Sequence, residues 1–255
     1  MKKKRKVIKK IVKITCSTLF LVSLYIVCTS LWEYKKGDDE YERILQTAVK
    51  QNPEKDKKGE ESGFEVDFDA LKRLNRETVA WIRFENPSKI NYPVLRASDN
   101  EKYLKTTFEG KEIAAGSIFM DCGNKSDFKD YITFIYGHNM KNGSMFGKLR
   151  QYKQKQFCED NPYFYIYTPN GKENKYQVFA VTVIEASPEN YRILFSDKQD
   201  FETYLKQVQK NALYNTGVEV SGESKVVALS TCTNVTKTQR LIVYGVKIEE
   251  RVVGE

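Results

Sequence analysis

Residues 225–248 read KVVALSTCTNVTKTQRLIVYGVKI, and this stretch contains two strand patterns joined by a polar loop. Both patterns are rich in β-branched residues, which pack well on a pleated surface. The first pattern runs into Cys232 and the second begins at Arg240, so a hairpin would bring the guanidinium back beside the thiol. The stretch therefore predicts a β-domain with reactive side chains at one end of a sheet.

Six further strand patterns precede this stretch and extend the prediction to a mainly β fold. Gly, Asn and Pro bound them, and they cover residues 81–84, 90–95, 116–120, 131–137, 163–168 and 175–186. Eight strands at uneven spacing predict a β-barrel or a sandwich. Apolar residues at helical spacing predict three peripheral helices, at residues 68–74, 145–152 and 197–213.

The net charge of +8 comes entirely from the N-terminus. Eight of the 42 basic residues lie in residues 1–13, which contain no acidic residue, so the remaining 34 basic residues balance the 34 acidic ones. A neutral body argues against nucleic-acid binding, because a phosphate-binding face needs clustered Lys and Arg.

An uncharged run of 19 residues follows, at positions 14–32. As a helix it would be about 28 Å long, which matches the hydrocarbon core of a bilayer. The cations lie on its N-terminal side, so the positive-inside rule places the N-terminus in the cytoplasm and the rest of the chain outside. The alternative is a cleaved signal peptide, but the run is longer than such a segment and no small-residue cleavage site follows it.

These patterns predict four segments along the chain. Residues 1–13 form a basic cytoplasmic tail, residues 14–32 a transmembrane signal anchor, residues 33–63 a polar stalk with one short helix, and residues 64–255 an extracellular domain. In the stalk, apolar residues recur at helical spacing between positions 41 and 48.

The chain has one histidine, His138, and imidazole is the side chain that ordinarily changes charge near neutral pH. If the chain uses imidazole as an acid or a base, this residue must carry the proton. An ordinary zinc site needs more histidines or clustered cysteines, so no metal is expected. The sequence contains no Gly-rich phosphate loop, and we expect no cofactor.

Five cysteines are present, and two of them, Cys16 and Cys28, lie in the predicted span. Cys122, Cys158 and Cys232 remain outside, an odd number that leaves at least one thiol unpaired. Cys232 is the best candidate for a reactive thiol because it ends a strand at a sheet edge. The alternative for each of these three cysteines is that it serves only as a small buried apolar side chain.

His138 and Cys232 have similar surroundings, since YITFIYG runs into the first and KVVALST into the second. If these two strands are parallel neighbours, the imidazole and the thiol share one rim of the sheet with Arg240. A thiol near a base and a cation is the arrangement for acyl transfer through a covalent intermediate.

The chain resembles the class B sortases, which are Gram-positive surface transpeptidases. The resemblance covers roughly residues 64–250 and includes the helix expected at 197–213. It is carried by YGHNM (136–140), GSMFG (143–147), ALSTCT (228–233), RLIVYGV (240–246), VDFDALKRLNRETVAWI (66–82), INYPV (90–94) and AAGSIFMD (114–121).

This resemblance implies a sortase-like β-barrel and a role for each motif residue. Cys232 would attack the carbonyl of a threonine in an NP-x-T-like sorting motif and form a thioacyl enzyme, and His138 would act as acid and then as base. Arg240 would stabilise the oxyanion and hold the peptide. The partners would be secreted proteins with a C-terminal sorting signal and a cell-wall precursor amine. Further substrate or oxyanion contacts are expected from Ser230, the backbone N–H of Thr233, Tyr136 and Asn91.

Two alternatives stay open on the sequence alone. Another extracellular cysteine peptidase or transpeptidase would place its cysteine before or close to its histidine, whereas Cys232 lies far after His138. In an anchored, non-enzymatic β-domain, such as an adhesin or an assembly factor, both residues would be merely structural. A thiol that resists alkylation in the folded protein would favour the second alternative.

Overall fold

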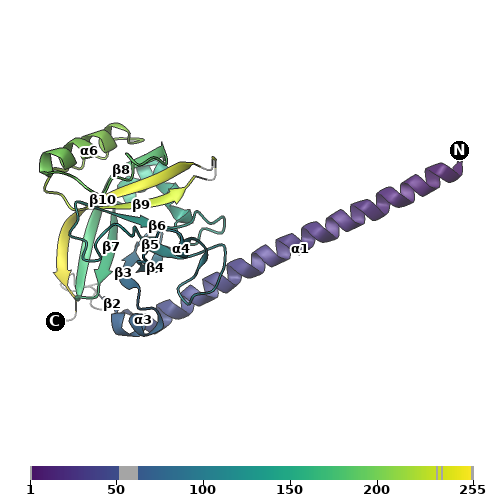
Figure 1. Cartoon of the computed structure of the whole chain (residues 1–255), viewed down its shortest axis with the longest axis horizontal. Helices are drawn as coiled ribbons and strands as arrows, with labels where there is room; N and C mark the ends of the chain where they lie inside the picture. The colour runs from purple at the N-terminus through teal and green to yellow at the C-terminus, as the bar shows by residue number, and fades with distance from the viewer. Residues whose placement is uncertain (1, 52–62, 234, 237, 254–255) are drawn as a thin grey trace.

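A computed structural model describes residues 2–51, 63–233, 235–236 and 238–253 of the chain. Eight strands close into a barrel in the order β10-β8-β7-β3-β4-β5-β6-β9 (Figure 1). The predicted β-barrel and all eight of its strands are confirmed. The strands are β3 (Thr78–Arg83), β4 (Asn91–Leu95), β5 (Ile118–Met120), β6 (Ile132–Tyr136), β7 (Tyr163–Thr168), β8 (Lys172–Glu185), β9 (Val226–Cys232) and β10 (Gln239–Val252).

The strands that lead to the predicted site are buried on both faces. Ile135 of β6 and Leu229 of β9 point into the barrel, whereas Phe134 and Ala228 pack outward with residues of helix α6 (Lys198–Lys210). Strands buried on both faces are expected to be mostly apolar, and these two are, apart from Thr133 in β6 and the Ser230–Thr231 pair near the end of β9. Apolar burial on both sides therefore holds β6 and β9 firmly in place.

Strand pairing brings three chain segments to one rim of the barrel. Strand β6 runs parallel to β9, with Tyr136 opposite Ser230, and β9 runs antiparallel to β10, with Cys232 opposite Arg240. The parallel arrangement on which a shared rim depends is therefore present, and the predicted hairpin is confirmed.

The peripheral helices largely follow the sequence prediction. Helix α3 spans Phe68–Leu74, and α6 occupies most of the expected residues 197–213. The pattern at 145–152 corresponds to a 3-10 helix, η1 (Gly147–Lys153), which continues into α5 (Lys155–Asp160). One short helix, α4 (Lys102–Lys105), has no counterpart in the prediction, because four residues are too few to show helical periodicity.

The N-terminal region differs from the predicted separate stalk. One helix, α1 (Lys2–Ala48), leaves the barrel as a long rod (Figure 1), and its apolar part has the length and composition to cross a membrane. Its last turns bury Tyr41, Ile44 and Ala48 against the barrel. Their spacing forms an apolar stripe, so this part of the expected stalk belongs to the core.

The chain after α1 also contributes to the folded unit. Strand β1 (Val49–Gln51) pairs antiparallel with β2 (Phe64–Val66), so the boundary expected at residue 64 falls inside a small sheet. The remainder of the predicted stalk, residues 52–62, lies outside the described residues.

Candidate active site

A pocket of about 270 Å³ lies where β6 and β9 end and β10 begins. Five predicted site residues line it together: Tyr136, His138, Ser230, Cys232 and Arg240. A cavity of about 300 Å³ between α3 and the β7–β8 turn has neither a thiol nor an imidazole in its lining. The described residues contain no group of three or more His, Cys, Asp and Glu side chains that could hold a metal ion.

Cys232 is the last residue of β9 and its thiol is unpaired and partly exposed. The Asn139 side chain donates a hydrogen bond of 2.7 Å to the Cys232 carbonyl, which fixes the backbone that carries the thiol. Cys122 and Cys158 are also free thiols. Cys158 is buried, and burial raises the pKa of its thiol, which favours the unreactive form.

His138 follows β6 and is half-buried. Its Nε2 atom lies 2.6 Å from the carbonyl oxygen of Leu104. A carbonyl oxygen only accepts hydrogen bonds, so Nε2 carries a proton. In the neutral ring the lone pair is therefore on Nδ1, which is available for proton exchange. The backbone is held as well, since the His138 carbonyl accepts a 3.0 Å hydrogen bond from the Phe146 N–H.

Buried hydroxyl groups complete the pocket wall. Tyr191 and Ser230 share a hydrogen bond of 2.7 Å, and burial raises the pKa of Tyr191, so its hydroxyl stays protonated. Tyr136 donates to Asp121 at 2.7 Å, and Asn100 donates to the same carboxylate oxygen at 2.9 Å. Burial raises the pKa of Tyr136, and the Asp121 charge raises it further. Both tyrosines are thus fixed neutral groups.

Two residues expected to contact substrate have other partners. The Asn91 side chain accepts a 2.6 Å hydrogen bond from the Trp81 indole and does not line the pocket. The Thr233 N–H donates to the Gln239 carbonyl at 3.2 Å, and their side chains are also hydrogen-bonded at 3.0 Å. In this conformation, pairing at the mouth of the β9–β10 hairpin uses the amide that was expected to serve an oxyanion.

Leu104, Tyr191 and Asn100 also line the pocket, and no sequence pattern predicted them. Leu104 contributes a backbone carbonyl, which carries no residue signature, and the other two lie in connections between strands and helices. Only the three-dimensional fold brings them to the pocket.

One known protein family matches this chain, and two relatives from that family are similar to it in sequence. The sortase domain family matches residues 86–248 of this chain. The sortase B of Listeria monocytogenes is 40% identical over 164 residues, which span 64% of this chain and 65% of that protein. The sortase B of Staphylococcus aureus is 32% identical over 184 residues, which span 71% of this chain and 74% of that protein.

Solved structures resemble the whole folded unit. The crystal structure of sortase B from B. anthracis in complex with AAEK1 superposes with a TM-score of 0.74 at 28% identity, over 86% of this chain and 99% of that one. A Staphylococcus aureus sortase B–substrate complex gives the same TM-score of 0.74 at 27% identity and the same coverage of both chains.

Proposed function

The chain belongs to the sortase family, class B, whose members are cysteine transpeptidases, and we propose that it cleaves the C-terminal sorting signal of secreted proteins and transfers them to a cell-wall amine. The observation that carries this proposal is the shared pocket rim of Cys232, His138 and Arg240, which strands β6, β9 and β10 build from distant parts of the sequence.

Each side chain has a defined task in the proposed first half-reaction. The Cys232 sulfur attacks the carbonyl carbon of a threonine in an NP-x-T-like motif, and Arg240 stabilises the negative charge on the carbonyl oxygen. His138 takes the thiol proton as the sulfur attacks, and it gives this proton to the departing amine as the peptide bond breaks. The products are a thioacyl enzyme and the released C-terminal fragment.

The second half-reaction reverses these roles. An incoming amine attacks the thioester carbonyl, and His138 takes the proton that the amine loses. The new amide bond forms as the carbon–sulfur bond breaks, and His138 passes this proton to the departing sulfur, which returns the Cys232 thiol. The Leu104 carbonyl holds the Nε2 proton through both halves, so Nδ1 is the nitrogen that exchanges the transferred proton.

The membrane anchor fits this chemistry. We propose that residues 14–32 cross the cell membrane once, with residues 1–13 in the cytoplasm and the barrel outside. The basic tail and the apolar part of α1 support this topology. Secreted proteins and cell-wall precursors would both reach the enzyme at the outer face of the cell membrane.

A peptide library tests the proposal. The full chain in detergent micelles is incubated with quenched peptides that vary around NP-x-T, with and without triglycine as the amine acceptor, and products are identified by mass. We expect cleavage after threonine and, with acceptor, a ligated product. If no peptide is cleaved and Cys232 resists alkylation, the chain is an anchored binding domain instead.

Tyr191→Phe is expected to raise the KM for the sorting peptide with little change in kcat. The variant removes the hydroxyl that orients Ser230 in the pocket. Loss of one neutral hydrogen bond costs about 1 kcal/mol, which corresponds to about a fivefold change in KM. Steady-state kinetics over a range of peptide concentrations measure KM and kcat. Tyr204→Phe is the matched control, because its half-buried hydroxyl donates to the Asn190 carbonyl outside this pocket. Equal KM values for the two variants would contradict the proposed role.

A further inference from the structure

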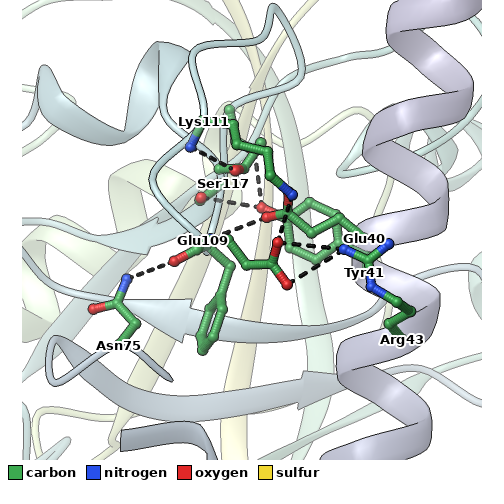
Figure 2. Close-up of polar contacts among 10 residues, drawn as sticks. Glu40, Tyr41, Arg43, Asn75, Glu109, Lys111 and Ser117 are labelled. Atoms are coloured by element: carbon green, nitrogen blue, oxygen red, sulfur yellow. Dashed lines mark hydrogen bonds and ion pairs between the residues drawn. The ribbon is translucent and has the colours of Figure 1, made fainter. Parts of the chain in front are cut away.

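A carboxylate of the long N-terminal helix is completely buried where α1 meets the barrel. Glu40 is 0% exposed, and its two oxygens accept hydrogen bonds from the Glu109 N–H and the Lys111 ammonium, each 3.0 Å long (Figure 2). One turn later, Arg43 lies 3.3 Å from the Glu109 carboxylate. A buried charge is tolerated only when it is paired and hydrogen-bonded, so these contacts fix α1 in one position on the β4–β5 connection.

The next residue of α1 makes a second buried contact with the same connection. The Tyr41 hydroxyl forms hydrogen bonds of 2.9 Å with the Gly116 carbonyl and 3.0 Å with the Ser117 hydroxyl (Figure 2). Ser117 in turn donates to the Thr106 carbonyl at 2.7 Å. Burial raises the pKa of Tyr41, so its hydroxyl remains a donor. Glu40 thus holds the middle of the segment 106–117, and Tyr41 holds its C-terminal end.

This segment packs directly against the backbone that binds the imidazole. Gly116 has a φ of +56°, and a side-chain carbon there would lie 2.4 Å from the Tyr103 carbonyl oxygen and 2.7 Å from that of Leu104. The Ser117 N–H donates to the Tyr103 carbonyl at 2.9 Å. The Leu104 carbonyl is the group 2.6 Å from Nε2 of His138. Two close backbone contacts therefore connect the anchor helix to the imidazole.

Helix α1 also reaches the loop that follows His138. The Asp38 carboxylate accepts a 3.1 Å hydrogen bond from the Asn142 side chain. The Tyr41 ring packs edge-on against the Tyr92 ring at 5.3 Å, and the Tyr92 hydroxyl accepts a 3.1 Å hydrogen bond from the Met145 N–H. The anchor helix therefore supports the imidazole on two sides.

We propose that Asp38, Glu40 and Tyr41 are positioning residues for His138, so that docking of the membrane-anchor helix on the barrel sets the placement of the imidazole. The proposal rests on the proposed function in giving His138 the proton transfer and α1 the role of membrane anchor. The transmembrane helix is then part of the catalytic scaffold as well as a tether. Positioning of this kind acts on the rate of the chemical step and leaves peptide binding unchanged.

Nuclear magnetic resonance of the imidazole tests the placement without substrate. His138 is the only histidine, so the side-chain nitrogen signals of the ¹⁵N-labelled, tag-free full chain in micelles report one residue. We expect the neutral ring of the unmodified chain to hold its proton on Nε2. In Tyr41→Phe we expect a mixture of the two tautomers. Tyr214→Phe is the matched control, because it removes a half-buried hydroxyl that donates to the Tyr152 carbonyl away from this pocket.

Steady-state kinetics of the same variants test whether misplacement of the imidazole lowers kcat. Tyr41→Phe is expected to lower kcat about tenfold, less than the hundredfold that a 1 Å misplacement of a reacting group can cost, with KM unchanged. A second pair of variants avoids a substitution at a buried position. Asp38→Ala should lower kcat in the same way, because it removes the partner of Asn142. Asp39→Ala, which replaces the exposed neighbouring residue, should leave kcat unchanged. Tyr214→Phe should also leave kcat unchanged.

The outcomes separate this inference from the proposed function. Unchanged imidazole signals and unchanged kcat in Tyr41→Phe and Asp38→Ala would overturn the positioning role while leaving the transpeptidase intact. Equal loss of kcat in the controls would also overturn it, because the effect would then be general destabilisation. A changed tautomer population in a chain that cleaves no sorting peptide would support the positioning role and contradict the proposed function.

Discussion

Replacing Cys232 by Ala is expected to lower the rate of sorting-peptide cleavage by about 10⁴-fold or more, the loss typical for removal of a nucleophile that forms a covalent intermediate. The alanine side chain has no atom that can form the acyl bond. Because Cys232 is partly exposed at a strand end, the substitution should leave the barrel intact. Chromatography of the cleaved peptide measures the rate, and thermal unfolding checks the fold.

Cys122→Ala is the matched control for this experiment. Cys122 is also a free and partly exposed thiol, and it does not line the pocket. The control should therefore cleave the peptide at the rate of the unmodified chain. Retained cleavage in Cys232→Ala would assign the nucleophile to another residue and overturn the active site described above.

His138→Gln is expected to lower kcat by roughly 10²–10⁴-fold, the usual contribution of a general acid and base. The glutamine amide can still donate a hydrogen bond to the Leu104 carbonyl, so the local backbone should be retained. The variant has no group that can take and return a proton near neutral pH. Steady-state kinetics over a range of peptide concentrations separate kcat from KM.

The reactivity of the Cys232 thiol distinguishes loss of the imidazole from damage to the pocket. Alkylation of Cys232 should still proceed in His138→Gln, because the partly exposed thiol remains in place. If kcat stays near that of the unmodified chain, the proton is transferred by another group. That result would remove His138 from the mechanism.

The barrel and the rim of the pocket were predictable from the sequence because their signals are local. Strands β6 and β9 are rich in β-branched and other apolar residues, and each leads to a single reactive residue at or just after its end. The short loop before Arg240 then leaves a hairpin as the simplest connection. These features led to the same three side chains that line the observed pocket.

The contacts between α1 and the barrel were not predictable, because they depend on residues distant in the sequence. Glu40 looks like part of a polar stalk until Glu109 and Lys111 are brought to it by the fold. The placement of Asn91 followed from the resemblance alone, and its bond to Trp81 across neighbouring strands accounts for its position outside the pocket. Nor does any sequence motif mark the Leu104 carbonyl as the partner of His138.

The most direct test of the account is the intact mass of the full chain after rapid acid quench of its reaction with a cleaved sorting peptide. A thioacyl enzyme adds the mass of the peptide fragment through threonine, less one water, and digestion should locate this addition on Cys232. The addition should disappear when an amine acceptor is supplied. Cleavage with no such addition, or with the addition on another residue, would contradict the covalent mechanism.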